Sequence, residues 1–141
     1  MNQEEQKIYK LVRQNLAFSY APYSKFAVSA AVVTQSGKVV TGVNVENSSY
    51  PCGICAERVA LFNYVSQGLI KDPIRFLMIS GNTPQPISPC GACRQVMSEF
   101  MGPEAQILLT DKDPDQIKRM TLKQLLPYYF TSEDLKNGQS K

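Results

Sequence analysis

Apolar residues recur along the chain with two different periods, which predict alternating helices and strands. Residues 4–17 carry apolar side chains three to four positions apart, the spacing of an amphipathic helix with one buried face. Residues 26–33 and 38–44 are rich in valine and alanine and flank a Ser36-Gly37 turn. We therefore expect a helix followed by two strands that pair as an antiparallel hairpin.

The rest of the chain alternates between helical and strand patterns. Strands are expected at residues 74–79 and 106–110, and helices at residues 56–67, after Cys90 and, as a short helix or turn, at residues 121–126. Gly68 is a candidate left-handed cap for the second helix. Because strand–helix–strand units join parallel strands, the sequence predicts an α/β fold with a mixed, mostly parallel sheet and helices on its faces.

Length and composition indicate an ordinary globular protein. The 141 residues are the size of one domain, so we expect a single domain over residues 1–141, with a tail that frays from about residue 136. The net charge is +3 and the basic residues are scattered, which argues against a nucleic-acid partner. A polar, acidic amino terminus and the lack of a long apolar run predict a cytoplasmic protein with no membrane partner.

The candidate chemistry lies in two C-x-x-C pairs, Cys52 with Cys55 and Cys90 with Cys93. In a reducing compartment such cysteines are metal ligands or catalytic thiols more often than disulfides. The chain has no histidine, which excludes a Cys-His nucleophile and every histidine zinc ligand. Each pair falls at the amino-terminal end of a predicted helix, where open α/β sheets usually place their ligand sites.

Spacing alone allows a closed, structural four-cysteine zinc site or a redox C-x-x-C protein. The neighbouring residues favour a catalytic site instead, because Glu57 follows Cys55 closely and three thiolates leave one zinc position open. Zinc deaminases combine such ligands with a glutamate that does not bind the metal. We therefore predict Zn²⁺ held by Cys55, Cys90 and Cys93, with Glu57 as the catalytic acid and base. Cys52 is either a fourth ligand or a spectator thiol.

Five separated motifs resemble one enzyme family. They are Pro22-Tyr23-Ser24-Lys25-Phe26, Asn44-Val45-Glu46-Asn47, Cys55-Ala56-Glu57-Arg58, Pro89-Cys90-Gly91-Ala92-Cys93-Arg94-Gln95 and Leu125-Leu126-Pro127. Over residues 8–135 the chain resembles the small homotetrameric cytidine deaminases. The resemblance implies a three-layer α/β/α fold with a sheet of about five strands. It also implies hydrolytic deamination of cytidine and deoxycytidine to the uridine nucleosides plus ammonia, in pyrimidine salvage.

The same resemblance implies roles for individual residues. Zinc-activated water would attack the amine-bearing ring carbon, with Glu57 as the proton shuttle. Asn44 and Glu46 would bind the ribose of the nucleoside substrate, and Phe26 would pack beside the base. Phe130, with Tyr128 and Tyr129 as alternatives, would close over the base in a neighbouring subunit.

Arg58 is a candidate for tuning the charge of the zinc site. Three thiolates give a zinc site a negative formal charge, which Arg58 could offset by hydrogen bonding to the ligand sulfurs.

The nearest rival function is deamination of another aminopyrimidine nucleoside, of the blasticidin S type. A non-catalytic four-cysteine zinc module is a further alternative; it would tolerate Glu57→Ala. Deamination within RNA or DNA is disfavoured, because the chain lacks a basic and aromatic strand-binding surface.

Overall fold

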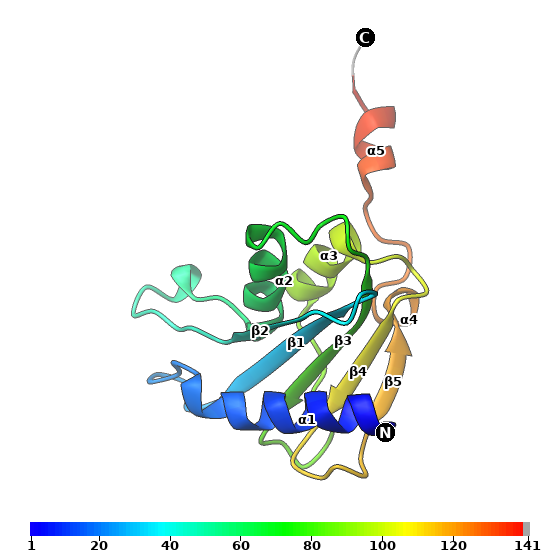
Figure 1. Ribbon diagram of the computed structural model, residues 1–141. Helices are drawn as coiled ribbons and strands as arrows, with labels where there is room; N and C mark the ends of the chain where they lie inside the picture. Colours follow the sequence, from blue (N-terminus) through cyan, green and yellow to red (C-terminus); the bar gives the residue numbers. More distant parts are fainter. Residues whose placement is uncertain (140–141) are drawn as a thin grey trace.

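The computed structural model describes residues 1–139 and contains one five-stranded sheet with helices on both faces (Figure 1). The strands are β1 (Val28–Thr34), β2 (Val39–Val43), β3 (Ile74–Gly81), β4 (Gln106–Thr110) and β5 (Lys118–Thr121), in the order β2-β1-β3-β4-β5. The α-helices are α1 (Gln3–Asn15), α2 (Ala56–Ser66), α3 (Gly91–Phe100), α4 (Leu122–Leu125) and α5 (Ser132–Asn137). Two short 3₁₀ helices, η1 (Leu16–Phe18) and η2 (Tyr50–Cys52), lie in the loops.

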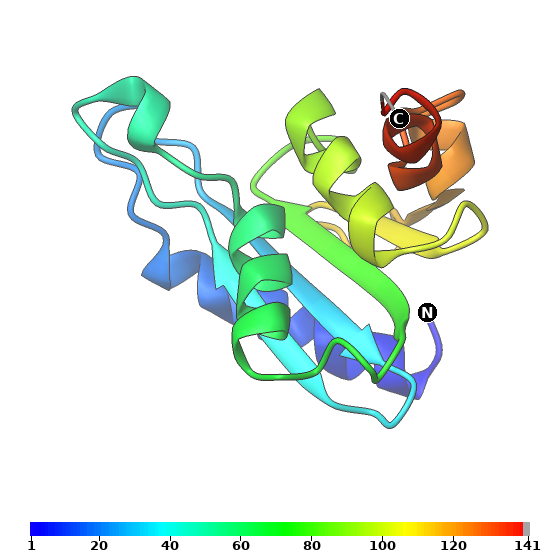
Figure 2. The same cartoon turned by 90° about the horizontal axis from the view of Figure 1, so that it is seen from above.

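The three layers follow from the alternation of side chains along the strands. Helix α1 covers one face of the sheet, where Val12 and Ala31 lie in one core, while α2 and α3 cover the other face, where Leu61 and Met97 lie in a second core (Figures 1 and 2). The expected three-layer α/β/α arrangement is confirmed. Within residues 1–139, no helix is long and apolar enough to span a lipid bilayer.

The directions of the strands confirm part of the predicted topology and correct another part. Strands β1 and β2 form the expected antiparallel hairpin, and β3 and β4 are parallel. However, β1 also pairs with β3, and β5 with β4, in antiparallel fashion. The sheet is therefore mixed, but its neighbouring strands are not mostly parallel. The reason is that β1 lies between β2 and β3 and separates two strands that point the same way.

The carboxyl-terminal part of the chain contains two elements for which no residue range was predicted. Strand β5 is a short edge strand, and helix α5 begins after Thr131, whose hydroxyl accepts a hydrogen bond from the backbone N–H of Asp134. Residues 136 and 137, expected to begin a frayed tail, belong to α5, whereas residues 140 and 141 of that tail lie outside the described residues.

Glycine at position 42 allows α2 to lie very close to β2. A Cβ atom added at Gly42 would lie 2.4 Å from the backbone nitrogen of Ala60 and 2.6 Å from the backbone oxygen of Ala56. Only glycine therefore fits between the strand and this helix. At the other end of α2, Gly68 has a φ of 74°, as expected for a left-handed cap. These contacts fix the position of the amino-terminal end of α2 relative to the sheet.

Candidate active site

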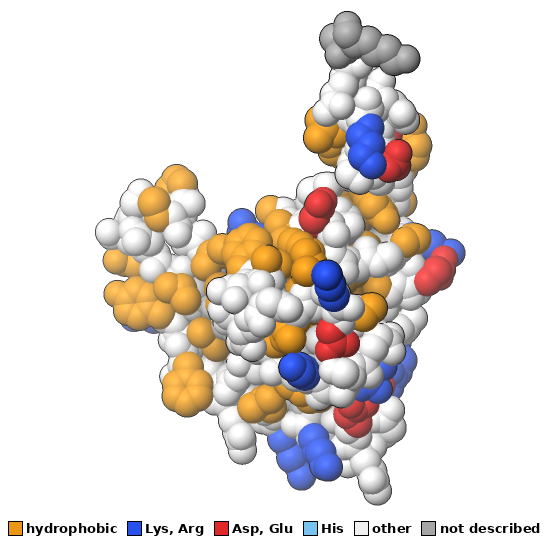
Figure 3. Space-filling view, turned by 45° about the horizontal axis from the view of Figure 1, so that its top comes forward, with side chains coloured by type: hydrophobic (Ala, Val, Ile, Leu, Met, Phe, Trp, Pro, Cys, Tyr) orange, Lys and Arg blue, Asp and Glu red, His pale blue; other side chains and the backbone are white. Residues whose placement is uncertain are grey.

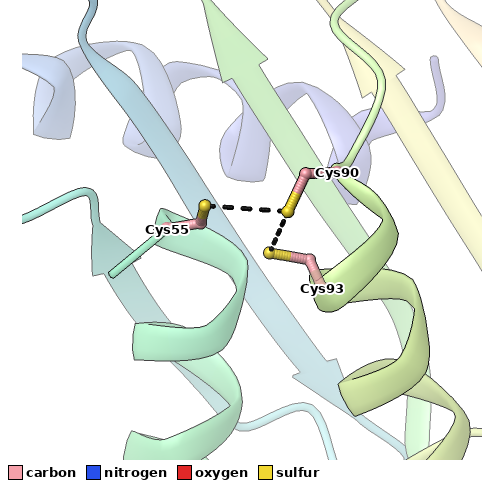
Figure 4. A group of neighbouring side chains, drawn as sticks. All are labelled: Cys55, Cys90 and Cys93. Carbon is pink, nitrogen blue, oxygen red and sulfur yellow. Dashed lines mark hydrogen bonds between the residues drawn. The ribbon is translucent and has the colours of Figure 1, made fainter. Parts of the chain in front are cut away.

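Three cysteine thiols from two helices converge above the sheet (Figure 4). Cys55 is the residue before the first turn of α2, Cys90 holds the same position before α3, and Cys93 lies in the first turn of α3. The Sγ atoms of Cys55 and Cys90 are 3.8 Å apart, and those of Cys90 and Cys93 are 3.4 Å apart. The structure thus brings together the three residues that were predicted as metal ligands.

The fourth cysteine does not join this group. Cys52 is exposed at the end of η2, and the cluster of ligand atoms that lie within 4.8 Å of one another contains only Cys55, Cys90 and Cys93 among the described residues. A closed four-cysteine site is therefore not formed, and Cys52 has the place of a spectator thiol. Three ligands and one open position are typical of catalytic zinc sites.

The geometry and charge of the three thiols fit a zinc ion. Tetrahedral zinc with Zn–S bonds of about 2.3 Å places its sulfur ligands about 3.8 Å apart, close to the separations observed here. Contact with Cys93 lowers the pKa of the Cys55 thiol to about 5, whereas contact with Cys55, together with burial, raises the pKa of Cys93. A divalent cation would favour the ionised form of all three thiols and so remove this conflict.

Positive charge surrounds the thiols from two sources. The amino-terminal ends of α2 and α3 both point at the cluster, and helix amino termini carry partial positive charge that favours thiolates. The Nη2 atom of Arg58 lies 3.6 Å from the Sγ atom of Cys55, and this contact raises the pKa of the guanidinium. Arg58 therefore lies where its positive charge can offset the negative charge of the thiolates.

Glu57 is a buried carboxyl group beside the thiols. It lies in the first turn of α2 and is only 4% exposed, whereas a glutamate at a helix start is ordinarily solvated. Burial raises the pKa of Glu57 to about 7, and the Cys55 thiolate acts in the same direction. A carboxyl group with such a pKa is available near neutral pH both as a proton donor and as a proton acceptor.

Asn44 and Glu46 both face the segment of residues 19–28, which connects α1 to β1. The Asn44 side chain accepts hydrogen bonds from the Ser19 hydroxyl (2.5 Å) and the Val28 N–H (2.9 Å), and it donates to the Phe26 carbonyl (2.7 Å). The Glu46 carboxylate accepts hydrogen bonds from the backbone N–H groups of residues 23 and 24 and from the Ser24 hydroxyl. These bonds, chiefly that from Ser24, hold the pKa of Glu46 below its usual value.

A cavity of about 360 Å³ lies beside Glu46. Its lining residues are Tyr23, Ser24, Glu46, Asn47, Tyr50 and Gly53. The rings of Tyr23 and Tyr50 meet edge to face, with 6.1 Å between their centroids. Sequence analysis assigned no role to these two tyrosines, because they lie in loops where no periodicity marks a buried or functional face.

The segment that carries Asn44 and Glu46 is tied by backbone hydrogen bonds to the residue before the first cysteine ligand. Val45 and Ile54 exchange two N–H···O bonds, of 3.0 and 2.9 Å, and Ile54 immediately precedes Cys55. On its other side, the N–H of Glu46 donates to the Tyr20 carbonyl at 2.8 Å. The backbone therefore fixes the position of residues 44–46 relative to Cys55.

The aromatic residues that were predicted to contact a base are both accessible. Phe26 is 46% exposed beside the Asn44 amide, and Phe130 is 59% exposed in the segment between α4 and α5. The Phe130 carbonyl accepts a hydrogen bond of 3.0 Å from the Gln95 side chain on α3. Phe130 lines a different cavity, with Tyr128, Tyr129, Thr131 and Asp134, which shares no lining residue with the cavity at Glu46.

Comparison with known proteins gives a consistent result. The family described as "Cytidine and deoxycytidylate deaminase zinc-binding region" matches residues 2–109. Cytidine deaminase of Halalkalibacterium halodurans is 39% identical over 132 residues, which cover 94% of this chain and 98% of that protein. Cytidine deaminase of Sporosarcina psychrophila is 44% identical, over 83% of this chain and 84% of that protein.

Solved structures agree with the sequence relatives. The crystal structure of cytidine deaminase from Burkholderia pseudomallei is similar to this fold with a TM-score of 0.84 and 39% identity, over 92% of this chain and 100% of that chain. Cytidine deaminase from Mycobacterium tuberculosis gives a TM-score of 0.71 and 36% identity, over 87% of this chain and 97% of that chain. The chain belongs to the zinc-binding cytidine and deoxycytidylate deaminase family.

Proposed function

We propose that the protein is a zinc-dependent hydrolase that converts cytidine and deoxycytidine, with water, to uridine and deoxyuridine plus ammonia, as a step of pyrimidine salvage in the cytoplasm. The observation that carries this proposal is the convergence of Cys55, Cys90 and Cys93 next to the buried carboxyl group of Glu57. The relatives at 39% and 44% identity, all of them named cytidine deaminases, support the choice of substrate.

Each side chain of the site has a part in this reaction. Cys55, Cys90 and Cys93 would hold Zn²⁺, which as a Lewis acid lowers the pKa of a bound water to about 7. Glu57 accepts a proton from the attacking water and delivers it to the pyrimidine ring nitrogen. It then takes the remaining proton from the newly added hydroxyl and passes it to the amine, so that ammonia leaves as the carbonyl forms. Its burial keeps bulk water from competing for these protons. Asn44 and Glu46 bind the sugar, and Phe26 packs beside the base.

The direct test is the ultraviolet change that accompanies conversion of cytosine to uracil. The purified, zinc-loaded protein should turn over both cytidine and deoxycytidine. Turnover of a blasticidin S-type nucleoside, with none of either cytosine nucleoside, would transfer the proposal to that substrate. No turnover of any aminopyrimidine nucleoside would overturn the proposed function.

Arg58 tunes the charge of the thiolate cluster in this proposal. Its removal leaves the ligands in place but withdraws a positive charge from the Cys55 sulfur. The Arg58→Ala variant should therefore deaminate cytidine about 10- to 100-fold more slowly, the usual cost of losing a group that supports a metal ligand. An unchanged rate, measured at equal zinc content, would contradict this role.

We also propose that the protein is a homotetramer in which a neighbouring chain completes each active site. Helix α5 stands clear of the sheet and of the other helices (Figure 1). Hydrophobic side chains on this helix and on the neighbouring face of the molecule are exposed (Figure 3). Phe130 and Leu135 are both more than half exposed. Light scattering should give the mass of four 15.7 kDa chains, and the mass of one chain would contradict the proposal.

A further inference from the structure

The loop between α1 and β1 holds the Glu46 carboxylate from three directions. The backbone N–H groups of Tyr23 and Ser24 donate to its Oε1 atom at 3.1 and 3.0 Å, and the Ser24 hydroxyl donates to its Oε2 atom. Ser24 is the residue of this loop whose side chain contacts the Glu46 carboxylate. Glu46 itself is half-buried and lies outside the two hydrophobic cores, so these hydrogen bonds are what hold its carboxylate in place.

The Ser24 hydroxyl is also fixed by the loop. Its oxygen accepts a hydrogen bond of 3.0 Å from the Phe26 N–H, so its hydrogen is free to point at Glu46. Between these residues Lys25 has a φ of 58°, and its N–H donates to the Ala21 carbonyl at 3.0 Å. The left-handed residue turns the chain sharply and brings the Phe26 N–H back to Ser24.

We propose that Ser24 is a positioning residue for substrate binding, which holds the Glu46 carboxylate in the orientation that receives a sugar hydroxyl. This inference rests on the proposed function, in which Glu46 binds the ribose. Both residues line the cavity of about 360 Å³, where the carboxylate can meet a ligand. A glutamate side chain has several rotatable bonds, and ordering it before the substrate arrives lowers the entropic cost of binding.

The effect of Ser24 falls on sugar recognition because Glu46 does not touch the thiols or Glu57. Removing the hydroxyl leaves the two backbone hydrogen bonds to Oε1 but takes away the hydrogen bond to Oε2, so the plane of the carboxylate is held less firmly. The Ser24→Ala variant should raise KM for cytidine about tenfold with little change in kcat, the scale of one hydrogen bond to a charged group. The Ser24→Thr variant keeps the hydroxyl and should restore KM to within about twofold of the parent.

A cytidine analogue without the two ring hydroxyls, dideoxycytidine, separates positioning from simple loosening of the loop. If Ser24 acts through Glu46 and a sugar hydroxyl, then Ser24→Ala leaves KM for dideoxycytidine unchanged. If the substitution only loosens the Phe26 backbone, KM rises equally for both substrates, and the proposal is overturned. Ser66→Ala, the same change at an exposed serine at the end of α2, serves as the matched control.

Different results would overturn the role of Ser24 and the proposed function. Turnover of cytidine by the parent, with no change in KM for Ser24→Ala, would overturn the role of Ser24 and leave the proposed function intact. No turnover of any aminopyrimidine nucleoside by the parent would overturn the proposed function and the role of Ser24 together. Zinc content and melting temperature, measured for each variant, confirm that the compared proteins are equally folded and loaded.

Discussion

Replacing Glu57 by glutamine should lower kcat for cytidine by about a thousandfold or more, within the range known for general acid–base groups. Glutamine has the shape of glutamate but cannot accept and release protons, and the buried position offers no other acid or base to replace it. The ligands are untouched, so the variant should still bind one zinc ion per chain. Steady-state rates, together with metal analysis of the same preparation, measure both outcomes.

The matched control is Glu99→Gln, the same chemical change at an exposed glutamate of α3. It should leave kcat and zinc content unchanged. If Glu57→Gln kept most of the parent rate with zinc bound, the proton shuttle would have to be another group. If it lost zinc instead, Glu57 would be part of the metal site rather than a catalytic acid and base.

Replacing Cys55 by serine should remove zinc and activity together. A serine hydroxyl is far less acidic than a thiol, and the Cys90 and Cys93 thiols are then the remaining pair of ligands. Cys52→Ser makes the same chemical change three residues earlier, at an exposed thiol outside the cluster. This variant should keep one zinc ion per chain and the parent rate.

Metal analysis and the ultraviolet assay distinguish the two cysteines directly. Loss of zinc from Cys52→Ser, with zinc retained in Cys55→Ser, would assign the ligand to Cys52. Loss from both variants would mean that all four cysteines bind metal, and that the site is closed to substrate.

Local patterns predicted the elements better than they predicted the pairing of strands. The buried face of α1 follows from the periodicity of its apolar residues. The cap of α2 follows from Gly68, because glycine adopts a left-handed conformation easily. The position of β1 between β2 and β3 depends on contacts between distant residues, which periodicity does not encode. Strand β5 escaped prediction because residues 118–121 form a short edge strand, where exposed Lys118 and Arg119 are tolerated.

The approach of the Cys90 and Cys93 thiols could be predicted, because C-x-x-C spacing at a helix start brings two thiols together by local geometry. The choice of Cys55 over Cys52 could not come from spacing, and the structure makes it by leaving Cys52 in the preceding 3₁₀ turn. The contacts of Ser19 and Ser24 with Asn44 and Glu46 join segments that are more than 20 residues apart. No local pattern marks such a pair, so its discovery required the fold.

The backbone pairing of Val45 with Ile54 has a consequence for how substrate range can change in this protein. The two residues close residues 46–53 into a loop with a hydrogen-bonded stem, so the stem rather than the middle of the loop sets the position of Glu46 relative to Cys55. Insertions or substitutions at residues 47–52 would alter the cavity wall that includes Tyr50. The clustered cysteines and Glu57 would keep their positions. This loop is therefore the place where new nucleoside specificities can be engineered without rebuilding the catalytic centre.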